Sequence, residues 1–448
     1  MADVRISSGS ARAYSSFSHI DMTKKASYIT LGCKLNYAET STYERGFMKE
    51  GYESVPWSEK ADLYVINTCS VTEHADRKSR NIIRKIHRTA PDATVIVTGC
   101  YAQLKRAEVE SLEGVSLVFG ANEKGSLVKT TLEFIDGRNV IRDNADVNDS
   151  VTFAAYSSGE ERTRSFLKVQ DGCDNFCAYC TVPFARGRSR SISIAEAVEG
   201  AKRIAASGVR EIVLTGVNTG DFGRKSGESF LDLLKALNEV EGIERYRISS
   251  IEPNLLTDEI VDWIASGTKF QPHFHIPLQS GSDTLLKDVG RKYSTEFFAS
   301  KIDYIREKMN PKPGDGSGRP DVFFGIDVIA GLPGETDELF METYNFLKDR
   351  VRPAFIHIFP YSRRAGTRSA ARKDQVQDCV KTKRVAMLEE LCKSLNEEFI
   401  ASQKGVKERV LFEESNNGGI MSGYTGNYIK VERPWDERLA GQIVEVTL

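Results

Sequence analysis

Three β-rich segments that each end at a cysteine constrain the fold of this chain more than any other feature. ASYITLGC ends at Cys33, ADLYVINTC at Cys69 and ATVIVTGC at Cys100. Helical patterns at residues 39–51 and 77–88 separate these segments. Alternating strands and helices predict a parallel, doubly wound sheet, in which binding sites lie beyond the carboxyl ends of the strands. We therefore expect the three cysteines to meet at one edge of this sheet.

A second group of cysteines, Cys173, Cys177 and Cys180, has the spacing C-x-x-x-C-x-x-C. Three close thiolates suit an iron–sulfur cubane, whereas a zinc site needs four ligands and no further cysteine or histidine lies nearby. Three ligands leave one of four irons open to a small molecule. Cys379 and Cys392 lie in helical sequence, and we interpret both as bystanders.

The first trio of cysteines allows two interpretations. A single cysteine after a strand is usually a small buried apolar residue. Three cysteines at equivalent strand ends instead favour a shared metal centre. Because three ligands again serve four irons, this centre would be a second cubane with one open iron.

Length and composition limit the class of protein. A chain of 448 residues is too long for one core and predicts two or three domains. No apolar run approaches the roughly 20 residues that span a membrane, and no signal peptide precedes the first strand. We expect a cytoplasmic protein with reduced thiols, because disulfide frameworks belong to small secreted chains. The net charge of −2 does not by itself favour nucleic acid.

Six further β-rich segments alternate with helices in the centre of the chain. They predict a partial (β/α)6 barrel whose site lies at the carboxyl ends of its strands, where the second cysteine trio follows the first strand. Ser193 and Glu196 form a predicted capping box for one helix, which Gly208 ends. The six predicted strands are residues 165–170, 211–216, 245–250, 273–278, 322–331 and 354–361.

The end of the chain has short β runs, glycine turns and aromatic residues, which predict a small antiparallel β-barrel. Such barrels often bind RNA, although a purely structural barrel is the alternative. The whole α/β chain then divides into a disordered extension (1–25), an N-terminal domain (26–134), a linker (135–163), a barrel (164–380), a connecting helix (381–402) and the small barrel (403–448).

Basic residues gather in two places. Arg77, Arg80, Arg84 and Arg88 share one face of a predicted helix, and Arg186 and Arg188 follow the second cysteine trio. Together they form a candidate phosphate footprint, while a solvated surface is the alternative for any one of them.

The sequence around these features resembles a known family. DGCDNFCAYCTVPFARGRSRS is similar to the cluster loop of radical S-adenosylmethionine enzymes, specifically the methylthiotransferases. Further similar segments are LGCKLNYAET, INTCSVTEHADRKSRNIIRK, VTGCYAQ, LTGVNTGDF, SSIEP, HIPLQSGSD, GLPGET and FPYSRRAGT, and GYTGNYIKV resembles the core of the TRAM module. The resemblance covers residues 25–448. GCKLN and NTCSVTEHADRKSR are most similar to the branch that acts on threonylcarbamoyladenosine in tRNA.

The resemblance implies two [4Fe–4S] clusters and S-adenosylmethionine. Cys173, Cys177 and Cys180 would hold the cluster that binds S-adenosylmethionine, whose cleavage yields a radical that removes hydrogen from carbon 2 of the adenine at position 37, beside the anticodon. The cluster on Cys33, Cys69 and Cys100 would deliver the methylthio group, so the first domain should cap the barrel mouth. The implied partners are the tRNA anticodon loop and a reductant such as flavodoxin or ferredoxin, and we expect a monomer.

The resemblance also suggests further site residues. Thr215, Gly216 and Asn218 would hold the cofactor's amino group and Glu252 its ribose, while a structural glutamate is the alternative for the latter. Gly331 and Gly334 would allow close approach to the cofactor or form an ordinary loop. Tyr424 and Tyr428 would stack on bases or fill the core of the small barrel.

Two other functions stay open from the sequence. The same chemistry would serve isopentenyladenosine in tRNA or a ribosomal protein. A non-catalytic iron–sulfur protein that binds RNA is the alternative from another class.

Overall fold

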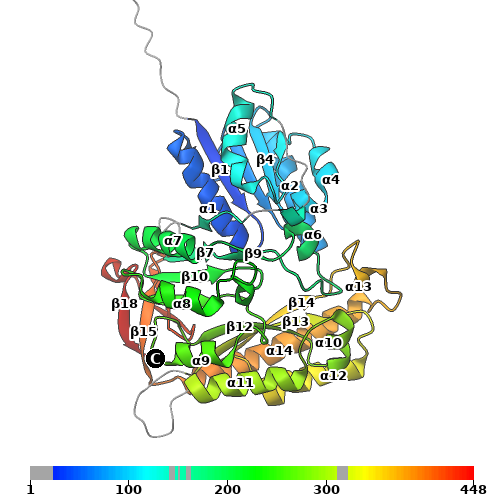
Figure 1. Ribbon diagram of the computed structural model, residues 1–448, viewed down its shortest axis with the longest axis vertical. Helices are drawn as coiled ribbons and strands as arrows, with labels where there is room; N and C mark the ends of the chain where they lie inside the picture. Colours follow the sequence, from blue (N-terminus) through cyan, green and yellow to red (C-terminus); the bar gives the residue numbers. More distant parts are fainter. Residues whose placement is uncertain (1–23, 141–146, 150–151, 158–162, 310–320) are drawn as a thin grey trace, which may run out of the picture.

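The computed structural model describes residues 24–140, 147–149, 152–157, 163–309 and 321–448, so the predicted extension lies almost wholly outside it. Two α/β units are stacked along the long axis, and an antiparallel sheet lies beside the second unit (Figure 1). Among the helices described, none combines the length and the apolar character needed to cross a membrane.

The N-terminal unit contains a five-stranded parallel sheet with the strand order β2-β1-β3-β4-β5. Its three central strands confirm the three predicted segments. The two edge strands contain only two residues each, and the sequence did not reveal them. The strands are β1 Lys25–Thr30, β2 Glu53–Ser54, β3 Leu63–Thr68, β4 Thr94–Gly99 and β5 Leu117–Val118.

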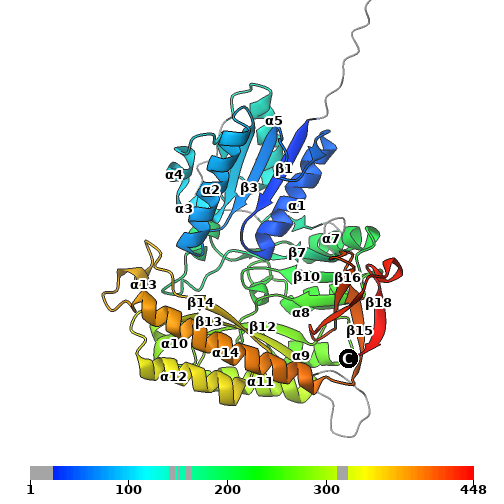
Figure 2. The same ribbon diagram turned by 180° about the vertical axis from the view of Figure 1, so that it is seen from behind.

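Helices cover both faces of this sheet, as the doubly wound prediction requires (Figures 1 and 2). On one face, Phe47 of α1 and Leu127 of α5 pack against Val65 and Ile96. On the other face, Ile83 of α2 packs with the neighbouring helices against the opposite side chains of the same strands. The helices are α1 Lys34–Lys49, α2 Glu73–Thr89, α3 Cys100–Leu104, α4 Arg106–Glu110 and α5 Leu127–Ile135.

The central unit contains all six predicted strands, in two parallel groups. One sheet has the order β11-β10-β7-β6, in which β6 alone is antiparallel, and the other has the order β12-β13-β14. A single parallel bridge between Tyr246 and Phe270 links the two groups. The strands are β6 Ala155–Tyr156, β7 Arg164–Lys168, β10 Glu211–Thr215, β11 Arg245–Ile248, β12 His273–Gln279, β13 Phe323–Ala330 and β14 Phe355–Pro360.

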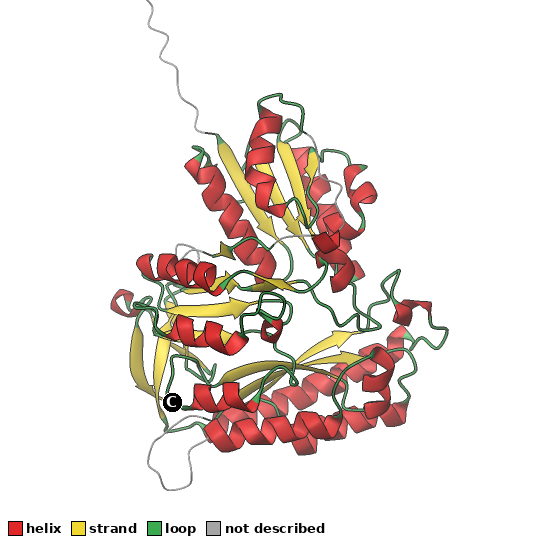
Figure 3. Ribbon diagram, in the orientation of Figure 1, coloured by secondary structure: helices red, strands yellow, loops and turns green. Residues whose placement is uncertain are grey.

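Helices pack on the outer side of these strands (Figure 3) and form the largest hydrophobic core with them. Ser193 and Glu196 form the predicted capping box at the start of α7. A short hairpin of β8 Gln170–Asp171 and β9 Arg190–Ser191 encloses the second cysteine trio and the helix α6 Val182–Arg186. The other helices are α7 Ile194–Ala206, α8 Phe230–Asn238, α9 Asp258–Ala265, α10 Asp283–Val289, α11 Thr295–Met309, α12 Asp337–Asn345, α13 Arg368–Ala371 and α14 Asp378–Ser402.

The C-terminal residues form a four-stranded antiparallel sheet with the order β17-β16-β15-β18. Val410, Phe412 and Met421 make its small core. The sheet is docked by Arg247 of β11, whose guanidinium donates to the backbone oxygens of Gly426 and Thr425, both at 2.7 Å. Its strands are β15 Lys407–Phe412, β16 Ile420–Tyr424, β17 Lys430–Pro434 and β18 Ile443–Thr447.

Candidate functional site

The second cysteine trio, called the loop trio below, lies between β8 and α6. Cys173 is anchored by its own N–H, which donates to the Gly187 oxygen at 3.1 Å. Each sulfur atom also accepts a hydrogen bond, two of them from neighbouring residues in the chain and one from the distant Arg291. The donors are Asn175 N–H to Cys173 Sγ (3.5 Å), Val182 N–H to Cys180 Sγ (3.4 Å) and Arg291 Nη1 to Cys177 Sγ (3.4 Å).

The first trio, called the dispersed trio below, occupies one edge of the N-terminal sheet. Cys33 is the N-cap of α1, Cys69 follows β3, and Cys100 begins α3. Cys33 and Cys69 follow adjacent parallel strands, at the point where strand order reverses and α/β sheets bind ligands. Gly99, with φ +96°, turns the chain into Cys100, and a Cβ there would lie 2.2 Å from the Thr68 oxygen.

The two trios lie where the N-terminal and central units meet. The helix that begins with Cys100, α3, packs against α6, which directly follows the loop trio. The carboxyl ends of the N-terminal strands are directed at the central unit in both views (Figures 1 and 2). The topology therefore places the helix that begins with Cys100 against the helix that follows the loop trio.

A buried ion network holds the two units together at this place. Glu39 of α1 accepts from Lys124 Nζ at 2.8 Å and from Lys168 Nζ of β7 at 2.7 Å. Arg186 bridges Glu39 (3.3 Å) and Asp171 (2.9 Å). Burial opposes ionisation of Glu39, but these three cations outweigh it and hold its pKa well below the usual range.

The buried position of Arg186 corrects one prediction. Only 2% of this residue is exposed, and its guanidinium also donates to the Asn36 side chain across the junction. It is therefore unavailable to RNA phosphates and instead holds the two units together. Arg188, by contrast, is exposed, lies over the Phe176 ring at 4.4 Å and remains a candidate RNA contact.

The thiol chemistry suits metal clusters. Burial raises the pKa of Cys69 and Cys180 to about 12 each and that of Cys173 to about 11, so positively charged metal must displace their protons. Around one zinc ion, with Zn–S near 2.3 Å, thiolates would lie about 3.8 Å apart. In the described part of the chain, neither trio has its three sulfur atoms within 4.8 Å of one another.

The predicted cofactor residues at the end of β10 surround an incompletely satisfied polar site. Gln170 Oε1 accepts the N–H groups of Val217 (2.9 Å) and Asn218 (3.0 Å), and Gly216 packs against the same glutamine. The hydroxyl oxygens of Thr215 and Ser249 are buried and have no hydrogen-bond partner. Buried polar groups are normally paired, so these hydroxyls fit a polar ligand such as S-adenosylmethionine.

Glu252 has partners of its own in the loop trio's surroundings. It accepts from Asn175 Nδ2 at 2.7 Å and pairs with Arg291 Nη2 at 2.8 Å. Because Arg291 also donates to Cys177, Glu252 positions the loop trio through this arginine. No sequence pattern indicated Arg291, which is far from the trio along the chain.

Gly331 and Gly334 have φ values of +82° and +80° and form a tight turn. An added Cβ would lie 2.4 Å from Lys381 Cγ and 2.6 Å from Arg372 Nη2, respectively. Neighbouring segments thus account for both glycines, in agreement with the ordinary-loop alternative. Their predicted cofactor contact rests on the family resemblance alone.

The basic helix α2 only partly fits the predicted phosphate footprint. Arg77, Arg84 and Arg88 are exposed. Arg80 is instead held by Glu108 at 3.0 Å and Glu73 at 3.3 Å, so its charge is already neutralised within the chain.

The predicted stacking tyrosines are also occupied. Tyr424 and Tyr428 stack on each other with ring centroids 4.9 Å apart, and Tyr428 packs on His273 at 4.8 Å. Arg164 lies over the Tyr424 ring at 4.4 Å. Both tyrosines therefore pack at the junction of the C-terminal sheet and the central strands, which corrects their assignment to base stacking.

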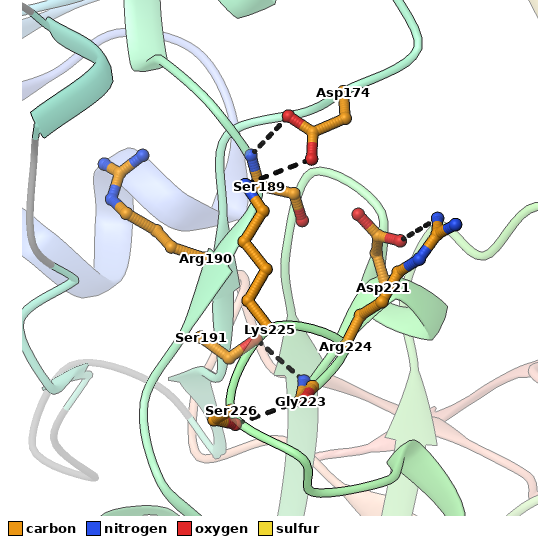
Figure 4. A pocket seen from close by; sticks show the side chains of 9 residues that line it. All are labelled: Asp174, Ser189, Arg190, Ser191, Asp221, Gly223, Arg224, Lys225 and Ser226. Atoms are coloured by element: carbon orange, nitrogen blue, oxygen red, sulfur yellow. Dashed lines mark hydrogen bonds and ion pairs between the residues drawn. The ribbon is translucent and has the colours of Figure 1, made fainter.

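A surface pocket lies beside the loop trio, between β9 and the segment after β10 (Figure 4). Its cations are paired within the pocket, Lys225 with Asp174 at 3.1 Å and Arg224 with Asp221 at 3.4 Å. Because these carboxylates neutralise the cations, the pocket is a poor site for a single phosphate.

Two family descriptions match this chain. Residues 25–120 match "Uncharacterized protein family UPF0004", and residues 167–347 match the radical SAM superfamily. The matches coincide with the two units that carry the dispersed and the loop trio.

Several curated relatives align along nearly the whole chain. A threonylcarbamoyladenosine tRNA methylthiotransferase MtaB of Bacillus subtilis is 39% identical, covering 94% of this chain and 92% of the relative. An enzyme of the same name from Aquifex aeolicus is 37% identical, covering 95% of this chain and 100% of the relative. A tRNA-2-methylthio-N(6)-dimethylallyladenosine synthase of Carboxydothermus hydrogenoformans is 30% identical, with coverage of 95% and 97%.

Solved structures support the fold. The radical S-adenosylmethionine methyltransferase TsrM of Kitasatospora setae superposes with a TM-score of 0.55 at 15% identity, covering 78% of this chain and 77% of that one. The radical enzyme OxsB gives a TM-score of 0.51 at 12% identity, with coverage of 84% and 56%. At such identities the similarity concerns the fold alone.

Proposed function

Because the chain belongs to the radical S-adenosylmethionine tRNA methylthiotransferases, we propose that it adds a methylthio group to carbon 2 of N6-threonylcarbamoyladenosine at position 37 of tRNA. Relatives named for threonylcarbamoyladenosine are 32–39% identical to it, against 30–31% for the dimethylallyladenosine synthases. This difference favours the first substrate over the second.

The enzyme uses S-adenosylmethionine and two [4Fe–4S] clusters. We assign one cluster to the loop trio, Cys173, Cys177 and Cys180, which would also bind S-adenosylmethionine. The other is assigned to the dispersed trio, Cys33, Cys69 and Cys100. When bound, these groups supply the radical chemistry and the sulfur that a methylthio transfer needs.

The observation that carries this proposal is the packing of α3 on α6, which brings the segments bearing the two trios together. Glu39, Lys168 and Arg186 link the two units at this junction with buried charges. Arg291 orients Cys177 through a direct hydrogen bond. The orphan hydroxyls of Thr215 and Ser249 are available to S-adenosylmethionine.

The finer architecture belongs to the same proposal. We interpret the six parallel strands β7, β10, β11, β12, β13 and β14 as a partial (β/α)6 barrel and the C-terminal sheet as a TRAM module. The domain boundaries follow the sequence-based division at residues 26, 135, 164, 381 and 403. The target adenine would be taken from the single-stranded anticodon loop, where unstacking costs little. A flavodoxin or ferredoxin would supply electrons to the monomeric, cytoplasmic enzyme.

The test is an anaerobic assay of the reconstituted enzyme with S-adenosylmethionine, a reductant and tRNA that carries either threonylcarbamoyladenosine or isopentenyladenosine. Nucleoside mass spectrometry should find the methylthio mark on the first tRNA only. A mark on the second alone would assign the enzyme to the other branch. RNA binding without 5′-deoxyadenosine formation would instead support a non-catalytic role.

A further inference from the structure

The strands β12, β13 and β14 direct alternate side chains to opposite faces, as β-strands do. One set packs outward into the large core, namely Phe274, Ile276, Phe324, Ile326 and Ile356. The intervening positions face the inner side of the sheet, where His275, Asp327 and His357 are only partly buried. The mechanism described above uses none of these three residues.

These three side chains converge on one point. His275 Nε2 lies 2.6 Å from Asp327 Oδ1, and the His275 and His357 rings have centroids 4.7 Å apart. The polar atoms of all three lie within 4.8 Å of one another. Each residue can form more hydrogen bonds than these contacts use, so together they can receive a polar ligand group.

A cation from the N-terminal unit faces the same place. Lys34 lies within electrostatic range of Asp327, and also of Arg247 and Arg164 on the inner side of β11 and β7. Lys34 is exposed to solvent, so its ammonium group is accessible to a ligand. No ion pair of Lys34 is seen in the part of the chain that the structure describes.

The position of Lys34 is set by α1. Tyr37, one helical turn further on, packs edge-on against Phe166 of β7 with centroids 5.7 Å apart. Lys34 also follows Cys33 directly, so this cation lies next to the dispersed trio.

Two exposed aromatic rings lie beside His357 on the same strand. Phe355 and Phe359 lie on β14 two residues before and after His357, and 39% and 44% of these residues are exposed. Phe355 contacts the His357 ring at 4.8 Å between centroids. Flat apolar rings next to polar groups suit a nucleobase with a polar substituent.

We propose that Lys34, His275, Asp327 and His357, called the inner polar cluster, bind the threonylcarbamoyl substituent of the target adenosine; this inference rests on the function proposed above. The substituent keeps the carboxylate and hydroxyl of threonine and adds carbamoyl N–H groups. Lys34 pairs with the carboxylate, and Asp327 accepts from the hydroxyl or an N–H. The two histidines complete the hydrogen bonds.

The same cluster explains selection against an apolar substituent. A dimethylallyl group would cover Lys34 and Asp327 without offering them any hydrogen bond or charge. Sites built for polar groups reject analogues that lack them by about 10⁴-fold, because the buried polar groups stay unpaired. The cluster therefore determines which modified adenosine enters.

The test measures binding of anticodon stem-loops to the reconstituted full-length enzyme by fluorescence anisotropy. Three stem-loops carry threonylcarbamoyladenosine, its carboxylate methyl ester or plain adenosine at position 37. The wild type should bind the free acid at least about tenfold more tightly than the ester, as expected for a charge-assisted contact. Lys34→Met should abolish the difference between acid and ester. Asp327→Asn should abolish the difference between ester and plain adenosine.

Matched controls separate recognition from folding. Lys49→Met removes an exposed lysine from the other end of the same helix and should keep every ratio at its wild-type value. Iron content and melting temperature should be unchanged in all variants, and Lys34→Arg should restore the preference for the acid over the ester. The stem-loop with plain adenosine should bind equally well to the wild type and to all variants.

Two results would overturn the subsite. One is an acid-to-ester ratio that Lys34→Met leaves intact. The other is an additional metal ion, one per chain besides the iron–sulfur clusters, that is lost in His357→Ala. Such an ion would make the inner polar cluster a cation site. If the variants behave as expected but the wild type forms no methylthio product on threonylcarbamoyladenosine, the proposed function fails and the subsite stands. If product forms and the binding ratios are the same in the wild type and the variants, only the proposed subsite is wrong.

Discussion

The loop trio and the dispersed trio offer the same number of thiols but are built differently. The loop trio lies within residues 173–180, and neighbours in the chain, Asn175 and Val182, donate to two of its sulfurs. The dispersed trio comes from the ends of three strands and exists only when the N-terminal sheet is assembled. Local chain geometry therefore maintains the first, whereas the second depends on tertiary packing and should be the more sensitive to distant changes.

The largest effect is expected when the loop trio is removed. Changing Cys173, Cys177 and Cys180 to Ala should lower iron from about eight to about four per chain, because one of two four-iron clusters loses its ligands. Cleavage of S-adenosylmethionine should fall at least about 10³-fold, since no open iron remains to bind it. Iron analysis and 5′-deoxyadenosine detection check both. The exposed bystander Cys379→Ala is the control, and an unchanged iron content in the triple variant would refute the assignment.

Removal of the dispersed trio should separate S-adenosylmethionine cleavage from delivery of the methylthio group. With Cys33, Cys69 and Cys100 changed to Ala, half of the iron should again be lost, but 5′-deoxyadenosine should still form with tRNA present. The methylthio product should be absent from the nucleoside mass spectrum. Product at the wild-type level would show that these cysteines do not hold the sulfur-delivering cluster.

The buried junction should couple the dispersed trio to the central unit. Glu39→Gln leaves Lys124, Lys168 and Arg186 without their shared anion, and breaking a buried ion pair in this way costs about 3–5 kcal/mol. Urea unfolding should show this loss, and product yield should fall more than S-adenosylmethionine cleavage. Glu50→Gln, just beyond the end of the same helix, should change neither. Equal losses of both activities would contradict the proposed difference between the trios.

The smallest effects are expected at the glycines that precede the cysteines. Gly99→Ala should weaken the dispersed cluster and Gly172→Ala the loop cluster, because both glycines have positive φ and an added Cβ would meet backbone oxygen at 2.2 and 2.1 Å, respectively. Such backbone strain costs of the order of 1–3 kcal/mol. Cluster loss during thermal unfolding, followed by visible absorption, measures it. Gly51→Ala, also at positive φ but with no atom near the added Cβ, should leave both clusters intact.

Much of the fold followed from patterns along the chain. The strands that end near Cys33, Cys69 and Cys100 lie where expected, as do all six central strands and the capping box of Ser193 and Glu196. The start of α1 was placed at Glu39 rather than Lys34, because the KLNYA segment lacks an apolar periodicity that marks a helix start. The edge strands β2 and β5 were missed because two residues are too few to show alternation.

The candidate site was less predictable wherever distant residues meet. Arg186 looked like a free cation after the loop trio but is buried beside Glu39, and Tyr424 and Tyr428 looked like stacking platforms but fill a junction. Arg291, which donates to Cys177, gave no signal at all. A charged or aromatic residue has the same appearance in the sequence whether it faces solvent or a partner hundreds of residues away.

The sequence by itself identified the candidate ligands, which are two trios of cysteines. One trio forms a compact motif, and the other follows the ends of three strands. Short-range spacing and side-chain periodicity are local properties, so they can be read directly from the chain. Only the tertiary structure decided that α3 packs on α6, that Glu39 ties the two units together, and that Lys34 lies within electrostatic range of Asp327. Those contacts depend on the packing of separate units, and the free energy of that packing comes from the whole fold rather than from any one segment.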